Sequence, residues 1–268
     1  MLFVAACGSE PRSAGAQDIS DLFHRPKEDF VDRAVLPRRP ARQFNASEPA
    51  RILVIGDSLA QGFGIFLDRR VKARDLAAVV VNKGRTSTGL ARSDFYDWPQ
   101  AFSVLAPEIR PDVVVAHFGS NDNQSIISTS GRVRQGADGW DDAYRAQVRR
   151  ILDVAAEHGA VLYLLGPAPD RNASLNGNMN RINPIFDQEA DTAQAIYLPL
   201  ASFAAGSNGE FVRNAVVNGK TVTIRSGDGS HFTGAGYYFV VDRLLADMET
   251  RMPDMFRENS VELAGILQ

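Results

Sequence analysis

The sequence has little cysteine and little histidine, with one cysteine and four histidines among 268 residues. A single cysteine cannot form a disulfide within the chain, and these numbers are too small for a Cys/His zinc cage. We therefore expect no metal site and no other cofactor. The sequence also lacks an apolar run of the roughly 18 to 20 residues that a membrane-spanning helix needs.

The chain has no excess of basic residues either. Its formal net charge is -3, so it has no global positive field that would attract a phosphate backbone, and we expect no nucleic-acid partner. Hydrophobic residues make up 44% and charged residues 23% of the chain. This composition is that of an ordinary globular protein and allows one sizeable core with an appended tail.

The N-terminus reads "MLFVAACGSE", in which three small or apolar residues precede Cys7, as in a bacterial lipoprotein cleavage box. The charged and apolar regions of a complete signal are absent, so either the true start lies upstream or the apolar start is fortuitous. The stretch 8–49 is rich in proline and charge, which is typical of a linker. We predict a tether or surface strap over 1–49, a lipid anchor at Cys7 with an extracytoplasmic (periplasmic) location if the signal is truncated, a folded domain over 50–255 and a tail over 256–268.

Short apolar runs alternate with helical patterns throughout the folded domain, which predicts a parallel sheet covered by helices on both faces. An amphipathic helix is predicted for Trp140–Glu157, and a second for about 234–250 with Thr233 as its N-cap. Asn218-Gly219 lies between two alternating runs and predicts a tight hairpin. The predicted strands are Ile52–Ile55, Ala77–Val81, Val113–His117, Val161–Leu165 and Ala195–Leu198.

Polar clusters follow the first and third strands and precede the last helix, where the carboxyl ends of parallel strands form sites. They read "GDSLAQG" with Ser58, "GSND" with Asn121, and "DGSH" with Asp228 and His231, and "NKGRTSTG" with Gly84 follows the second strand. In order and context these four blocks resemble the SGNH, or GDSL, hydrolase superfamily. The run "GRTSTGLARSDFYDWP" is similar to the bacterial subgroup called domain of unknown function 459. The resemblance implies a three-layer, flavodoxin-like α/β fold with a mostly parallel five-stranded sheet.

The residue types also support nucleophilic catalysis directly. A serine hydroxyl needs a base to accept its proton, and the base needs a partner that fixes its tautomer. His231 has Asp228 three residues earlier, so one loop can present both groups to Ser58. Taken singly, Ser58 is equally consistent with a helix cap and Asp228 with a loop carboxylate.

The resemblance implies an oxyanion hole formed by the Ser58 N–H, the Gly84 N–H and the Asn121 amide. Gly89 is an alternative to Gly84, because it lies in the same small-residue loop. Asn121 with Asp122 is also compatible with a simple turn.

Other polar and aromatic residues near these blocks are candidates for substrate contact. Tyr96 and Trp98 either form a wall for a sugar ring, pack in the core or anchor a lid. Arg85 and Arg92 either meet an anionic substrate or lie on a solvated face. His117 is expected to line the pocket. The full set of expected substrate contacts is Asp57, Arg85, Tyr96, Trp98, His117 and Asp122.

The sequence therefore predicts a serine esterase that needs no metal and removes acyl groups, of which acetyl is the expected one, from a carbohydrate or small ester. One alternative is an O-acyltransferase of cell-envelope glycans, which would need a separate membrane partner as acyl donor. Another is a glycan-binding protein that retains the fold without catalysis.

Overall fold

The computed structural model describes residues 43–256. The predicted tether or strap, including Cys7, lies almost entirely outside the described residues, as does the predicted C-terminal tail. These predictions, and the extracytoplasmic location that depends on them, stay predictions. Within residues 43–256, no helix combines the length and apolar character required to cross a bilayer.

Five parallel strands form the central sheet, in the order β2-β1-β3-β6-β7. The prediction of a mostly parallel sheet is therefore confirmed, and the sheet is in fact parallel throughout. Each predicted strand is found within two residues of its expected ends. The strands are β1 (Ala50–Gly56), β2 (Ala78–Asn82), β3 (Val113–His117), β6 (Val161–Gly166) and β7 (Ile196–Pro199).

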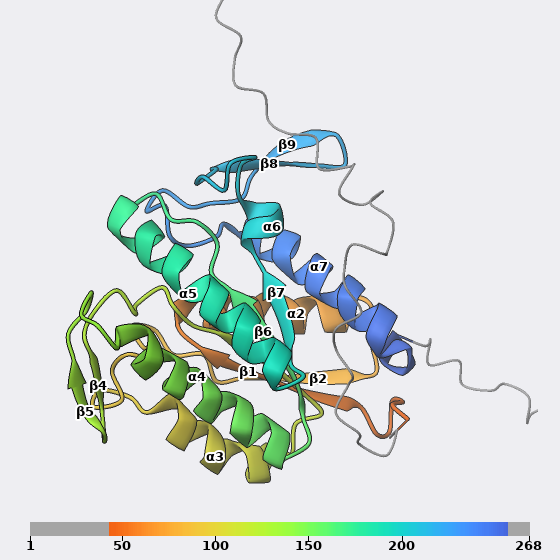
Figure 1. Ribbon diagram of the computed structural model, residues 1–268. Coiled ribbons are helices and arrows are strands. Elements are labelled where there is room, and N and C mark those ends of the chain that lie inside the picture. The colour runs from red at the N-terminus through yellow and green to blue at the C-terminus, as the bar shows by residue number, and fades with distance from the viewer. Residues whose placement is uncertain (1–42, 257–268) are drawn as a thin grey trace, which may run out of the picture.

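Helices cover both faces of this sheet, as Figure 1 shows. One face packs against α3 (Trp98–Ile109), α4 (Trp140–Glu157) and α5 (Ala173–Thr192). The other packs against α2 (Ser58–Ala73), the short α6 (Ala201–Ala204) and α7 (Gly234–Arg251), which leads into the 3-10 helix η1 (Pro253–Phe256).

Side chains of β1 and β3 alternate between the two layers, because successive residues of a strand point to opposite faces. Ile52 and Val54 contact the α2 and α7 layer, whereas Leu53 and Ile55 contact the α3 and α4 layer. All four are completely buried. Each such aliphatic side chain contributes about 1.5–3 kcal/mol of burial free energy, so the strands need no polar face.

The predicted helices and hairpin are confirmed. Helix α4 has the expected bounds, and the Thr233 hydroxyl accepts a hydrogen bond from the Gly236 N–H at the start of α7. Asn218 and Gly219 both have positive φ, at 51° and 71°, and join β8 (Asn214–Val217) to β9 (Lys220–Thr223). A two-residue turn of this kind matches the twist of the paired strands.

Two helices and one small hairpin lacked a clear sequence signal. Helices α3 and α5 contain Pro107 and Pro184, which obscure a helical pattern. The small hairpin of β4 (Ile126–Ser128) and β5 (Gly131–Val133) is too short for a readable alternation.

Candidate active site

Ser58 is the first residue of α2 and directly follows the turn that leaves β1. The preceding Asp57 caps the helix, because its carboxylate accepts hydrogen bonds from the N–H groups of Leu59 at 2.9 Å and Ala60 at 3.2 Å. Gly56 has φ of +128°, and a Cβ at this position would lie 1.9 Å from the His117 carbonyl oxygen. The strand-to-helix turn that carries Ser58 therefore requires glycine at this point.

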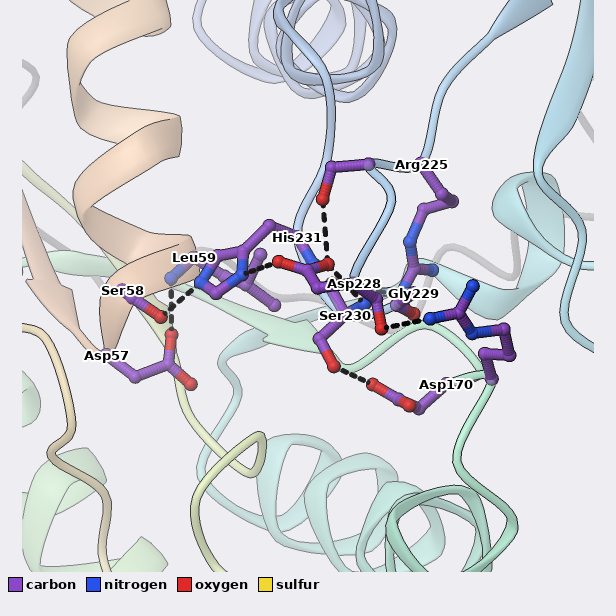
Figure 2. Close-up of polar contacts among 11 residues, drawn as sticks. Asp57, Ser58, Leu59, Asp170, Arg225, Asp228, Gly229, Ser230 and His231 are labelled. Carbon is purple, nitrogen blue, oxygen red and sulfur yellow. Dashed lines mark hydrogen bonds and ion pairs between the residues drawn. The ribbon is translucent and has the colours of Figure 1, made fainter.

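The loop before α7 brings a histidine and a carboxylate to this serine (Figure 2). The Ser58 Oγ lies 2.8 Å from the His231 Nε2, and the His231 Nδ1 lies 2.8 Å from an Asp228 carboxylate oxygen. The side chains of His231 and Asp228 are 43% and 52% exposed. A serine, a base and an orienting carboxylate thus form one hydrogen-bonded row that is open to solvent.

The second carboxylate oxygen of Asp228 organises its own loop. It accepts hydrogen bonds from the Ser226 hydroxyl at 2.7 Å, the Ser230 N–H at 2.8 Å and the His231 N–H at 2.9 Å. Partial burial opposes ionisation of Asp228, but these donors and the His231 side chain outweigh it and lower the Asp228 pKa well below its ordinary value. Asp228 is therefore ionised across the neutral and mildly acidic range.

A buried arginine stabilises the same loop through hydrogen bonds to its backbone. Arg225 is 1% exposed, and its guanidinium donates to the carbonyl oxygens of Pro169 at 2.9 Å, Gly229 at 3.1 Å and Ser230 at 2.9 Å. Burial lowers the pKa of Arg225 from its ordinary value. The guanidinium carbon also lies 4.7 Å from the ring centroid of Phe232, the residue after the histidine.

Two further contacts fasten the loop to the segment that follows β6. The Ser230 hydroxyl donates to a carboxylate oxygen of the buried Asp170, as Figure 2 shows, and Arg171 donates to the Asp228 carbonyl oxygen at 3.1 Å. Sequence reasoning missed Arg225, Asp170 and Arg171. None of them belongs to a motif, and their partners are backbone atoms or residues about 60 positions away, so no local signal could have found them.

The candidate oxyanion donors lie on neighbouring strand ends, but two of them have other partners. The Gly84 N–H donates to the Asn82 side-chain oxygen at 3.1 Å, and the Asn121 amide donates one hydrogen to the Thr88 carbonyl oxygen at 2.9 Å. An Asn amide carries two hydrogens, so one remains for a ligand. The Asp57 carboxylate accepts hydrogen bonds from the N–H groups of the second and third residues of α2, and not from the Ser58 N–H.

The two glycines compared in the sequence play different packing roles. A Cβ at Gly84 would lie 2.4 Å from the backbone nitrogen of Gln61, in the first turns of α2. A Cβ at Gly89 would lie 2.1 Å from a carboxylate oxygen of Asp122. Gly84 therefore lies against the helix that carries Ser58, whereas Gly89 permits the close approach of a buried carboxylate.

Four of the expected substrate contacts are buried, which corrects that expectation. Asp57, His117 and Asp122 are 0% exposed and Trp98 is 1% exposed. Asp122 accepts hydrogen bonds from the Ala91 N–H and the Tyr144 hydroxyl, and burial raises its pKa. The Trp98 indole donates to Thr88. None of these side chains reaches the surface. Their hydrogen bonds in the interior stabilise the loops around the site.

Arg85 and Tyr96 instead line an open groove of about 690 Å³ beside Gly84. The Arg85 guanidinium carbon lies 4.5 Å from the ring centroid of Tyr96. Lys83 and apolar residues of α3 such as Val104 and Leu105 also line this groove. Arg92, the other candidate for anion binding, forms a two-pronged ion pair with Asp94 and is held by it. In residues 43–256 no cluster of three or more His, Cys, Asp or Glu side chains could hold a metal ion.

We predict that Asp228→Asn lowers kcat by roughly 100- to 10,000-fold, because the amide cannot stabilise an imidazolium as a carboxylate does. The lowered pKa of Asp228 means that its hydrogen bonds stabilise the fold fully above about pH 4, the ordinary aspartate pKa, and that this contribution is lost as pH falls toward the lowered value. The difference in melting temperature between wild type and variant should therefore stay constant above about pH 5 and shrink as the pH falls below about pH 4. Asp75→Asn, in the turn after α2, is the matched control for turnover. Wild-type kcat in the Asp228→Asn variant would contradict the role of Asp228.

We predict that Arg225→Met lowers the free energy of unfolding by about 2–4 kcal/mol, because three carbonyl oxygens lose their buried donor. Urea denaturation measures this loss. Arg213→Met, at an exposed position before β8, should change the same quantity by less than about 0.5 kcal/mol. Equal stabilities of the two variants would show that Arg225 does not fasten the loop.

Comparisons with known proteins identify the family of this chain and its fold. The model of a family described as "Protein of unknown function (DUF459)" matches residues 51–247. No curated protein sequence matches the chain. Among solved structures, TesA is 18% identical and has a TM-score of 0.53, with 75% of this chain and 98% of that chain covered.

Two other solved structures show the same fold. An acetyl xylan esterase, AlAXEase, is 18% identical with a TM-score of 0.54, covering 74% of this chain and 98% of its own. A GDSL-like lipase from Bacteroides thetaiotaomicron is 15% identical with a TM-score of 0.52, covering 75% of this chain and 89% of its own.

Proposed function

The chain belongs to the DUF459 family and has the fold of the SGNH, or GDSL, hydrolases, and from this premise we propose that it is a metal-independent serine esterase. The observation that carries the proposal is the hydrogen-bonded row from Ser58 through His231 to Asp228. A glycan-binding protein without catalysis has no need for a base within 2.8 Å of a partly buried serine.

In the acylation step, the Ser58 hydroxyl donates its proton to the His231 Nε2 as the Oγ attacks the ester carbonyl carbon. The imidazolium that forms keeps its Nδ1–H on Asp228, which is ionised and stabilises the positive charge. Collapse of the tetrahedral intermediate breaks the bond to the alcohol oxygen. His231 returns the proton to that oxygen, and the acyl group remains on Ser58.

In the deacylation step, water takes the place of the alcohol. His231 accepts a proton from the water while the water oxygen attacks the acyl carbon. His231 then returns this proton to the Ser58 Oγ as the carboxylic acid is released. The exposure of the His231 side chain supports water as the acceptor, because solvent reaches the base directly.

The negative charge of each tetrahedral intermediate needs donors already in place. We assign the Ser58 N–H and the second hydrogen of the Asn121 amide to this role. Gly84 contributes its N–H only if the bond to Asn82 opens, so it is the weaker candidate in this structure.

For the substrate, we propose an acetyl ester of a carbohydrate or of another small alcohol. The groove beside Gly84 supports an extended alcohol portion, because Arg85, Tyr96 and apolar residues of α3 line it. One structure with this fold is an acetyl xylan esterase, which supports the same class. An acyltransferase would use the same residues with a sugar hydroxyl as the acceptor, and acyl label retained on a glycan would identify it.

We predict that the protein hydrolyses an aryl acetate and that a fluorophosphonate abolishes this activity by labelling Ser58. The reagent reacts with a serine whose proton a neighbouring base accepts, and it forms a stable phosphonyl ester at the Oγ. Intact mass and peptide mapping locate the label, and acetylated oligosaccharides are then screened as substrates. Ser87→Ala, in the loop beside Gly84, should label normally. Labelling at any other residue with turnover intact would contradict the proposal.

A further inference from the structure

An aspartate and a histidine next to Ser58 form a second pair that the proposed mechanism does not use. The His231 pair is open to solvent, whereas Asp57 and His117 are both 0% exposed. The His117 Nδ1 lies 3.0 Å from the Asp57 Oδ1, which is the same oxygen that caps α2. The two residues come from different elements, since His117 ends β3 and Asp57 precedes α2.

The hydrogen bonds of this pair define its tautomer. The Asp57 oxygen is an acceptor, so the proton lies on the His117 Nδ1. The His117 Nε2 makes no hydrogen bond in the described part of the protein, and the ring contacts Phe63 edge to face at 5.5 Å. A second N–H at that position would be buried without an acceptor, which is costly. His117 therefore donates to Asp57 through its Nδ1–H, and it cannot serve as a base for the substrate because no solvent reaches it.

His117 also contacts the backbone of the same turn. Its carbonyl oxygen accepts from the Asp57 N–H at 3.2 Å and occupies the space that a Cβ on Gly56 would fill. Side chain and main chain of one residue thus hold both residues that precede Ser58. Four positions later in the chain, the segment leaving β3 carries Asn121, the candidate oxyanion donor.

We propose that His117 is a positioning residue, whose Nδ1–H bond to Asp57 fixes the first turn of α2 against the end of β3. It thereby aligns the hydroxyl and N–H of Ser58 with His231 and with the Asn121 amide. This inference rests on the proposed function, because it concerns the alignment of the same serine. Loss of the bond lets the turn shift by a fraction of an ångström, which is enough to slow a step that depends on alignment.

Two substitutions separate positioning from simple packing. His117→Phe keeps an aromatic ring against Phe63 but removes the donor to Asp57. His117→Asn loses the ring but places an amide N–H close to the former Nδ1. Positioning predicts that His117→Phe lowers kcat for aryl acetate by about 10- to 100-fold with KM unchanged, and that His117→Asn, although less stable, retains more of kcat. Packing alone predicts the reverse order.

Val115→Ala is the matched control. Val115 is buried on the same face of β3, and its side chain cannot form a hydrogen bond with Asp57. It should lower the melting temperature while leaving kcat within about 2-fold. If His117→Phe turns over like wild type, or if Val115→Ala loses kcat as severely, the positioning role is wrong.

Proton NMR tests the pair independently of turnover. The buried Nδ1–H of His117 should give a slowly exchanging downfield signal in the wild type, and His117→Phe should lack it. Absence of this signal from the wild type overturns the pair itself. If the signal is present but no ester is hydrolysed by the wild type, the proposed function fails and the positioning role fails with it, while the hydrogen bond stands.

Discussion

His231→Ala is expected to lower kcat for an aryl acetate by roughly four to six orders of magnitude, and Ser58→Ala by a similar factor. The two side chains share one proton across 2.8 Å, so that removing either leaves a nucleophile without a base or a base without a nucleophile. The double variant should be no slower than the single variants, because residues that act as one unit are not additive.

The matched control for this prediction is His158→Ala, at the C-terminal end of α4. It removes an imidazole from the same protein and should keep wild-type kcat. Melting temperatures of all variants check that they are folded. Turnover within 10-fold of wild type in folded Ser58→Ala or His231→Ala would remove the hydrogen-bonded row from the mechanism.

Asn121→Ala is expected to lower kcat by roughly 100- to 1,000-fold with little change in KM. The amide hydrogen that is not donated to Thr88 is free to reach the developing oxyanion, so its effect falls mainly on the transition state. Loss of the Thr88 bond should also lower the free energy of unfolding by about 1 kcal/mol. Both quantities are measured on one preparation.

Asn123→Ala provides the comparison for Asn121, because Asn123 lies in the same segment after β3. Its amide donates to the hydroxyl of Ser174 in α5 at 2.9 Å. It should show a stability loss of similar size and an unchanged kcat. If Asn121→Ala is destabilised but turns over like wild type, Asn121 supports the turn after β3 and takes no part in the oxyanion hole.

The chain order of elements could be read from the sequence because local patterns carried it. The apolar runs of β1 and β3 are uninterrupted, and α4 shows its buried face in the spacing of Trp140, Tyr144 and Val148. Thr233 and Asn218-Gly219 have strong preferences for a cap and a tight turn. By contrast, α5 escaped detection because Pro184 and its many polar residues blur the period.

Side-chain burial at the site was not readable in the same way. Asp57 and Asp122 lie within the motifs, and His117 and Trp98 lie close to them in sequence, which suggested substrate contact. The structure buries them because each has a partner that no local pattern reveals, such as the Tyr144 hydroxyl for Asp122 and Thr88 for the Trp98 indole. Burial of a polar group depends on such distant partners, since an unpaired polar group in the interior is costly.

The sequence by itself determined the parallel α/β class and the four polar blocks, because strand and helix periods and turn chemistry are local properties. Only the tertiary structure decided which atoms of these blocks meet. It brought Ser58 within 2.8 Å of His231 across 173 positions and Asp57 within hydrogen-bond distance of His117 across 60, and it bound Arg225 to the backbone of the loop that carries His231. The physical reason for the contact of Asp57 with His117 is the register of β1 and β3, which pairs Gly56 with His117 at the carboxyl ends of these strands. The loop with Arg225 and His231 reaches the same place because it leads into α7, which packs against α2.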